Sequence, residues 1–520
     1  MNNIFFTRKI CASLKGSARM ENIMNIKEAK QEIKDTVRAY LQKEDGGSYC
    51  IPSIRQRPIL LMGPPGIGKT QIMEQIAREC RVALVAYTIT HHTRQSAVGL
   101  PFIREEQYEE NTYSVTEYTM SEIIASIYQK IKVTGVKEGI LFIDEINCVS
   151  ETLAPTMLQF LQCKTFGNQA IPEGWIIIAA GNPPEYNKSV REFDMVTLDR
   201  VRYISIEADY EVWKEYAREK KLHTALLSYL ELRPKNFYRV EADVDGLQFV
   251  TARGWEDLSE LMKVYEALDI PITQQVIYEF LRHEDVAEDV AAYLELYRKY
   301  QDDYGIEQIL QGKVRTDVYK RLVQAAFDER LSVVNLLVDG LNRYMEHFYE
   351  KKVYIDLWYA FLQIYRAGVE STEHPAAYYR RLLEEKEKEI RLKEQADFYT
   401  VQQKRHQRKL LTDLQLFVPS DGQNAKEAFE TAKKGFADQI KLLEELEDRA
   451  GQALEHAFDF MEDAFGEAEE MVIFVTELTM TTESASFLSE YECERYQKYN
   501  QKLLIGTRRR KLLSELQDRD

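Results

Sequence analysis

The chain has 520 residues, of which 45% are hydrophobic and 29% are charged, and its formal net charge is −17 at pH 7. This composition is ordinary for a soluble globular protein and leaves room for two to four domains of roughly 100 to 200 residues each. The negative charge repels phosphate backbones, so it argues against binding of nucleic acid unless a local basic groove overrides it.

The N-terminal residues, the lack of a long apolar run and the cysteines indicate the cellular compartment. No stretch approaches the roughly 20 apolar residues of a membrane span, and residues 1–20 lack the apolar core of a secretory signal. The six cysteines form no CxxC pair, which excludes a zinc knuckle and fits a reducing, cytoplasmic setting. We predict an N-terminal tail over 1–24, in which Met20 or Met24 could be the true start.

Residues 25–207 alternate helical and strand patterns, which predicts a parallel sheet covered by helices on both faces. Asn25 is placed to cap the first helix, and Thr119 with Glu122 has the spacing of a capping box. The predicted elements, in chain order, are a helix over 26–43, a strand over 58–62, a helix over 69–80, a strand over 82–90, a helix from 119 to about 132, and strands over 139–143, 175–180 and 203–206.

The chain after residue 207 is predicted to be helical throughout. We expect a helical lid over 208–300, a helical connector over 301–370, and an all-α C-terminal region over 371–520. The charged, periodic segments 375–416 and 425–466 predict two arms of one long antiparallel hairpin of coiled-coil character, joined by a turn at 418–422.

Two charged segments of this region have alternative interpretations. Residues 441–470 contain 11 acidic and two basic residues, a local net charge of −9, which is typical of a solvated helical face or of a docking face for a basic partner. Arg508 to Lys511 form a basic run, which we interpret as a cationic helix end rather than as a nucleic-acid patch.

Residues 63–70 match the phosphate-binding pattern G-x-x-x-x-G-K-[ST] between a predicted strand and a predicted helix. The glycines let successive backbone N–H groups point at phosphate oxygens, and the helix start adds its positive end. Lys69 supplies a charge to the β- and γ-phosphates, and the Thr70 hydroxyl can bind Mg²⁺. The predicted site for ATP and Mg²⁺ consists of Gly63, Pro64, Pro65, Gly66, Ile67, Gly68, Lys69 and Thr70.

Two more strand ends supply polar side chains. The apolar run 140–143 ends in Asp144 and Glu145, and parallel strands deliver such residues to the sheet edge where ligands bind. Asp144 can hold the Mg²⁺ ion through water, and Glu145 can orient or deprotonate an attacking water molecule, which favours ATP hydrolysis. Asn182 follows the next strand and could reach the γ-phosphate or the water, although an asparagine before proline is more often a turn residue.

Together these motifs resemble those of AAA+ ATPases, and within them the MoxR-like branch. The segments that carry the resemblance are GPPGIGKT at 63–70, ILFIDEIN at 140–147, IIIAAGNPPEYN at 176–187 and TLDRVR at 197–202. The resemblance covers about residues 35–300. It implies a P-loop core with a five-stranded parallel sheet, an α-helical lid and a ring of subunits, commonly six.

The resemblance also implies roles for individual residues. Asn182 corresponds to the sensor of the family, and Arg200 to the finger that enters the neighbouring subunit's site. Val201 stands where the family usually has an aromatic residue, so Arg191 and Arg202 remain alternatives to Arg200. Arg253 resembles the second sensor in the lid, although many relatives have proline at the preceding position.

The segment 91–100 lies where family members have a loop that faces the pore or a partner. Its His91-His92 pair suggests metal binding, but no third ligand is suitably spaced, so we do not predict a metal site there.

The hypothesis from the sequence is an ATP-hydrolysing machine that remodels or activates a protein client in a chaperone-like manner. The resemblance further implies a partner with a von Willebrand factor A domain. One alternative is an ATP-driven nucleic-acid motor of the restriction type, which would need a basic loop or a DNA-binding domain. The other is a slow ATP-dependent scaffold, against which the presence of Glu145 argues.

Overall fold

The computed structural model describes residues 23–91, 93–108, 111–166, 169–187, 190–191, 193–243 and 246–503. Most of the predicted tail, His92 and the basic run Arg508 to Lys511 therefore lie outside the described residues. The chain forms two compact units, Met1–Val212 with Gln395–Phe398, and Trp213–Glu394 with Tyr399–Asp520. In the described residues no helix is long and apolar enough to cross a membrane.

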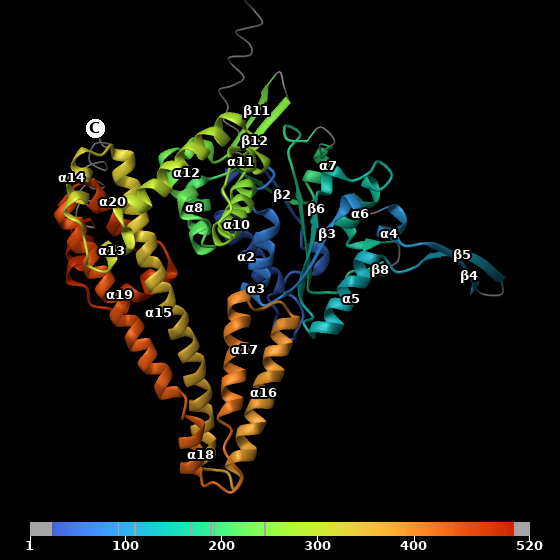
Figure 1. Cartoon of the computed structure of the whole chain (residues 1–520). Coiled ribbons are helices and arrows are strands. Elements are labelled where there is room, and N and C mark those ends of the chain that lie inside the picture. Colours follow the sequence, from blue (N-terminus) through green and yellow to red (C-terminus); the bar gives the residue numbers. More distant parts are fainter. Residues whose placement is uncertain are drawn as a thin grey trace, which may run out of the picture. The chain divides into compact units, whose positions relative to one another are not determined.

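A parallel sheet forms the centre of the first unit, as predicted (Figure 1). All residues of its strands β2 and β9 are buried, which is the pattern of strands covered on both faces. In spatial order the strands are β1 (Ile23–Met24), β10 (Arg202–Ile206), β2 (Ile59–Met62), β9 (Trp175–Gly181), β6 (Gly139–Asp144) and β3 (Ala83–Thr88).

The prediction of five strands is wrong by one, because the sheet has six in the described residues. The additional strand β1 pairs in parallel with β10, with Ile23 opposite Ser205 and Met24 opposite Ile206. A strand of two residues is too short to show any alternation of apolar and polar residues in a sequence.

Of the three helices predicted for the first unit, those over 26–43 and 69–80 begin at their predicted positions, and the one predicted from 119 begins later. Asn25 caps α2 in a complete capping box with Glu28. The capping box predicted at Thr119 is wrong, because the Thr119 hydroxyl accepts the N–H of Leu100 and the helix starts only at Glu122. The α-helices are α2 (Ile26–Leu41), α3 (Lys69–Cys80), α4 (Arg94–Val98), α5 (Glu122–Thr134), α6 (Ala154–Cys163) and α7 (Met195–Leu198), with 3₁₀ turns η1 (Ser53–Arg55), η2 (Ile89–His91) and η3 (Ile146–Cys148).

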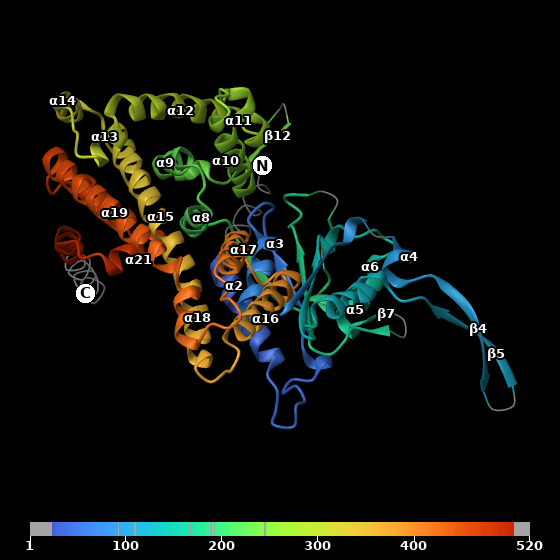
Figure 2. The same ribbon diagram turned by 60° about the horizontal axis from the view of Figure 1, so that its bottom comes forward.

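A two-stranded antiparallel ribbon, β4 (Pro101–Tyr108) and β5 (Asn111–Tyr118), separates α4 from α5. It projects away from the sheet of the first unit in both ribbon views (Figures 1 and 2). No strand is predicted there from the sequence. A shorter ribbon, β7 (Thr165–Phe166) and β8 (Gln169–Ala170), lies between α6 and β9.

The second unit is mainly helical, but the prediction that 208–370 is wholly helical is wrong. An antiparallel pair, β11 (Arg239–Asp243) and β12 (Gly246–Val250), interrupts the helices. Its sequence signal is Asp245-Gly246, a dipeptide that favours a tight hairpin turn. The helices up to residue 369 are α8 (Tyr210–Glu219), α9 (Thr224–Leu232), α10 (Ala252–Ala267), α11 (Gln274–Phe280), α12 (Glu284–Tyr304), α13 (Ile306–Leu310), α14 (Thr316–Gln324) and α15 (Phe327–Val369), with a 3₁₀ turn η4 (Pro234–Asn236).

The predicted hairpin between 375–416 and 425–466 is also wrong, because neither arm is one helix. Asp397 adopts a left-handed φ of 57°, and Thr400 starts a new helix with its own capping box. The first arm therefore folds back on itself, and the second runs beside α15 (Figure 1). The helices after residue 370 are α16 (Pro375–Gln395), α17 (Val401–Leu416), α18 (Ala425–Ala432), α19 (Phe436–Phe465), α20 (Glu469–Glu477) and α21 (Thr482–Glu490).

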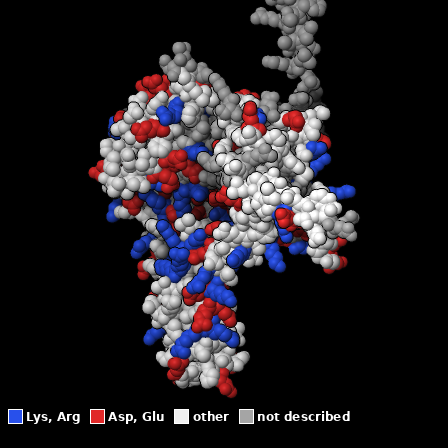
Figure 3. Space-filling view, turned by 90° about the vertical axis from the view of Figure 1, so that its right-hand side faces the viewer, with Lys and Arg blue, Asp and Glu red and all other residues white. Residues whose placement is uncertain are grey.

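The packing of α16 on α17 explains this arrangement. Tyr379 and Leu383 of α16 share one buried cluster with Leu410 and Leu414 of α17 and with residues of α15. The Tyr379 hydroxyl donates to the carbonyl of Leu414 at 2.9 Å. The exposed side of the pair carries interleaved basic and acidic side chains (Figure 3).

The acidic segment 441–470, which includes most of α19, has basic partners inside its own unit. Arg495 contacts Asp459 at 2.5 Å and Glu455 at 3.6 Å, and Lys502 pairs with Glu467. Part of the negative charge that the sequence places on 441–470 is therefore neutralised by residues that follow it in the chain.

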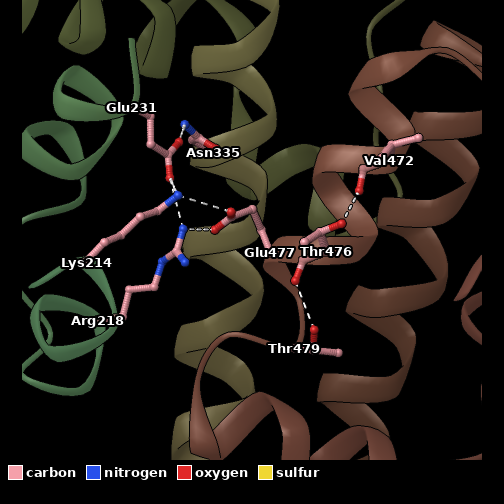
Figure 4. A network of polar contacts seen from close by, with 8 residues as sticks. All are labelled: Lys214, Arg218, Glu231, Asn335, Val472, Thr476, Glu477 and Thr479. Carbon is pink, nitrogen blue, oxygen red and sulfur yellow. Dashed lines mark hydrogen bonds and ion pairs between the residues drawn. The ribbon is translucent and has the colours of Figure 1, made fainter. Parts of the chain in front are cut away.

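A partly buried ionic network joins four helices of the second unit (Figure 4). Glu231 of α9 lies 2.5 Å from the Lys214 ammonium and 2.9 Å from the Arg218 guanidinium. Glu477 of α20 pairs with the same two cations, and Asn335 of α15 donates to Glu231 at 2.9 Å. Each carboxylate thus has charged partners, as a buried ion needs.

Candidate functional site

The loop of residues 63–70 connects β2 to α3 and has the backbone that its glycines permit. Gly66 and Gly68 have φ values of 73° and 93°, a region that side-chain-bearing residues avoid. A Cβ on Gly63 would lie 2.8 Å from the carbonyl oxygen of Ile206, so the start of the loop packs directly on the end of β10. The loop ends at the first turn of α3, whose N–H groups lack partners within the helix.

Lys69 brings the loop and the end of β9 together. Its side chain is buried, with 8% of its surface exposed. The Lys69 ammonium donates to the carbonyl oxygens of Gly63 and Pro64 and to Oδ1 of Asn182, each at 2.8 Å. The predicted neighbours Lys69 and Asn182 are therefore adjacent in the fold.

Thr70 and Asp144 form the second contact of the site. The Thr70 hydroxyl donates to Oδ2 of Asp144 at 2.9 Å, which joins the start of α3 to the end of β6. The other carboxylate oxygen of Asp144 accepts the N–H of Glu145 at 2.9 Å. A hydroxyl beside a carboxylate is an all-oxygen donor set of the kind that Mg²⁺ prefers, so these residues fit the predicted ion.

Glu145 has a strained backbone and a fixed side chain. Its φ is 58°, in the left-handed region that costs a non-glycine residue roughly 1 to 2 kcal/mol. Its carboxylate accepts a hydrogen bond from the Thr90 hydroxyl at 2.9 Å, and Thr90 lies in the 3₁₀ turn after β3. Such strain is found at functional sites because it directs a side chain away from the ordinary course of the chain.

Asn147 holds the backbone of Asn182, a role that is not predicted from the sequence. It is 2% exposed, and its Nδ2 donates to the backbone carbonyl of Asn182 at 2.7 Å. A Cβ on Gly181 would approach Oδ1 of Asn147 to 2.6 Å, so this glycine is needed for the close contact. The only available signal was the position of Asn147 shortly after Asp144 and Glu145.

The cysteine next to the acidic pair is not a reactive thiolate. Burial raises the pKa of the Cys148 thiol above its ordinary value, and the charges of Glu145 and Asp144 raise it further. The thiol is therefore protonated at neutral pH. Its sulfur accepts a hydrogen bond from Asn187 at 3.4 Å.

The three candidate finger arginines have different surroundings. Arg202 is held by Glu32 and Thr36 of α2, so its guanidinium ties that helix to β10. Arg191 pairs with Glu151 at 2.8 Å. Arg200 is exposed directly after α7, whose residues Met195 and Val196 are exposed as well.

Arg253 belongs to the second unit, so its contribution to this site stays a prediction. It is exposed in the first turn of α10, which is capped by Thr251, whose hydroxyl accepts the N–H of Gly254. The next residue, Trp255, is fully buried and anchors this turn through a hydrogen bond to the carbonyl of Phe237.

Comparison with known proteins identifies the core. Residues 59–197 match the family model described as AAA, the ATPase family associated with various cellular activities. The matched range contains the phosphate loop, Asp144, Glu145 and Asn182, so this part of the chain is similar to an AAA ATPase domain.

The other comparisons are weaker. Two solved structures of RuvB mutants from Thermotoga maritima are similar at 14% and 13% identity, with TM-scores of 0.27 and 0.29. They cover 49% and 55% of this chain and 69% and 76% of their own chains. No curated protein matches the sequence.

Proposed function

We propose that this protein is an AAA+ ATPase that binds ATP with Mg²⁺ and hydrolyses the nucleotide with water. The observation that carries the proposal is the meeting of Lys69, Thr70, Asp144 and Asn182 through hydrogen bonds of 2.8 to 2.9 Å, with Glu145 beside Asp144. These residues come from the start of one helix and the ends of two strands.

Each residue has a role that its surroundings support. When bound, MgATP supplies the phosphoryl group that water attacks. Lys69 and the loop N–H groups bind the phosphates, while Thr70 and Asp144 hold the ion. Glu145 accepts the proton of the attacking water, with Thr90 keeping its carboxylate in place, and Asn182 orients the water or the γ-phosphate.

We further propose that the protein works as a ring, commonly of six subunits, in which Arg200 completes the neighbouring site. Arg200 is the better choice among the three arginines because it is exposed, whereas Arg202 and Arg191 are paired with Glu32 and Glu151. An arginine supplied in trans contributes about 10³ to 10⁵ in rate in related phosphoryl-transfer systems. Arg253 of the second unit acts as the second sensor.

We assign the chain to the MoxR-like branch on its motifs, and we propose that ATP turnover remodels or activates a client protein. A partner with a von Willebrand factor A domain fits that assignment. The helical second unit is the candidate platform for such a partner, because the AAA family model ends at residue 197, before this unit begins.

The test is ATP turnover of the whole chain as a function of its concentration, with and without DNA. We expect specific activity to rise with concentration and to be independent of DNA. Glu145→Gln should keep nucleotide binding and abolish turnover, whereas Glu173→Gln should have no effect, because Glu173 is exposed before β9 at the opposite end of that strand.

Two further variants separate the parts of the proposal. Lys69→Ala should abolish nucleotide binding, and tight ATP binding by that variant would contradict the phosphate-loop assignment. Arg200→Ala should bind ATP but not hydrolyse it, and mixing it with Glu145→Gln subunits should restore activity. Turnover that is stimulated by DNA and independent of protein concentration would instead support a nucleic-acid motor.

A further inference from the structure

The β4–β5 ribbon is a pair of strands held at its base, where the Tyr118 carbonyl accepts a hydrogen bond from Gln169. Each strand has eight residues, and the register runs from Pro101 opposite Tyr118 to Tyr108 opposite Asn111. Figures 1 and 2 both show it reaching away from the sheet of the first unit. No third strand pairs with either edge among the described residues. Two-stranded ribbons are marginally stable by themselves, so a ribbon of this length indicates a functional role.

The side chains of the ribbon do not cover a core. Phe102 is 42% exposed and Tyr113 is 52% exposed, and the register puts them on one face. Ile103, on the opposite face, is 76% exposed. Exposed apolar residues beside open strand edges mark a surface that binds another chain.

The two edges of the ribbon are different. The β4 edge carries Pro101, Arg104, Glu105 and Glu106, and proline and charged residues are the means by which proteins prevent strand pairing. The middle of β5, residues 112–116, reads Thr-Tyr-Ser-Val-Thr, which is uncharged and composed mainly of residues that favour strands. The outer edge of β5 is therefore the one open to an added strand.

The net charge of the ribbon indicates which kind of strand can bind to this edge. Residues 101–118 contain five glutamates and one arginine, a net charge of −4. A second copy of the ribbon would bring another net charge of −4 alongside the first, and this repulsion disfavours pairing of two copies. A segment with lysine or arginine at alternate positions has the complementary charge.

We propose that the outer edge of β5 binds a basic, extended polypeptide segment of the client protein by strand addition. Alternate residues of β5 direct their N–H and C=O groups away from β4, and these pair with the backbone of the segment. The glutamates of the ribbon attract its basic side chains, and the exposed apolar residues contact those between them. This inference deepens the proposed function, on which it rests for the existence of a client.

The binding test uses the full chain without ATP turnover, so its result is separate from that of the ATPase test. The probe is a fluorescein-labelled eight-residue peptide in which lysine alternates with valine, measured by fluorescence anisotropy. One control peptide has alternate backbone amides N-methylated, and a second has glutamate in place of lysine. Strand addition predicts that each control raises Kd at least tenfold.

The matched protein variant lacks the ribbon. Residues 102–117 are replaced by Asn-Gly, a tight hairpin turn that can join Pro101 to Tyr118 because these two residues are paired neighbours. Unchanged binding of a fluorescent ATP analogue shows that the first unit is folded. We expect peptide binding to be lost in this variant and weakened in the triple variant Glu105→Gln, Glu106→Gln, Glu117→Gln.

Several results would overturn the inference. Equal binding of the N-methylated peptide would show that charge alone is responsible, and binding by the ribbonless variant would place the site elsewhere. No binding of the basic peptide by the full chain would remove the proposal. Self-association of the full chain that disappears with the ribbon would make a second copy the occupant.

Discussion

Replacing Lys164 by methionine should stabilise the first unit at neutral pH and lose this advantage at high pH. Lys164 lies at the end of α6 and is 6% exposed. Its ammonium is 3.4 Å from Oε1 of Gln56 and 3.5 Å from Oγ of Ser53, which are both neutral groups. Burial lowers its pKa from 10.5 to about 8.

The effect on the free energy of unfolding follows from the pKa shift of Lys164. A pKa lowered from 10.5 to about 8 corresponds to about 3 kcal/mol, at about 1.4 kcal/mol for each unit. Because the folded-state pKa is the lower one, the unfolded chain binds more protons between pH 8 and 10.5, and stability rises with pH in that window. The penalty is complete below about pH 8. Methionine removes it but also removes two long hydrogen bonds, worth about 1 kcal/mol together, so the net gain at pH 7 is about 2 kcal/mol.

Pulse proteolysis with subtilisin in urea, with mass spectrometry of peptides from the first unit, measures this free energy in the whole chain. The stability difference between Lys164→Met and the wild type should fall by about 2 to 3 kcal/mol from pH 7 to pH 10. The control Lys132→Met changes an exposed residue of α5 and should alter stability by no more than about 0.5 kcal/mol. A Lys164→Met difference that does not change with pH would refute the reasoning.

Three other predictions concern the site and the second unit. Thr90→Val removes the hydroxyl that holds Glu145, so kcat in a phosphate-release assay should fall roughly 3- to 10-fold with Kd for ATP unchanged; an unaltered kcat would make Thr90 irrelevant. Gly68→Ala places a side chain at a φ of 93°, which costs about 1 to 2 kcal/mol, and calorimetry should show ATP binding about tenfold weaker. Glu477→Gln leaves Arg218 with less negative charge and should destabilise the second unit by about 1 to 3 kcal/mol in urea; a stability equal to that of the wild type would show that the network contributes nothing.

The sequence predicted the elements whose signals are local. The buried apolar runs before the phosphate loop and before Asp144 appear as β2 and β6, because strands covered on both faces need continuous apolar residues. Asn25 caps its helix as predicted. The proximity of Lys69 to Asn182 and of Thr70 to Asp144 could also be predicted, since parallel strands end at a common sheet edge.

The elements that the sequence did not predict depend on distant partners or on weak local signals. Thr90 and Asn147 acquire their roles only when their hydrogen-bond partners, Glu145 and Asn182, arrive from other strands. The break after α16 contains neither glycine nor proline, and its signal was the capping box at Thr400. The β4–β5 ribbon packs on no core, so its strands lack the strict alternation of buried and exposed residues that usually identifies a strand.

The length of α15 has a mechanical consequence. A helix of 43 residues extends about 64 Å at 1.5 Å per residue, and α19 runs beside it for much of that distance. Two packed helices of this length bend little, so they transmit a rotation instead of absorbing it. A tilt of about 5° at one end of α15 would displace its other end by about 6 Å, the rise of roughly four helical residues. The second unit thus has the dimensions of a lever, in which a small angular change at one end becomes a displacement of several ångströms at the other.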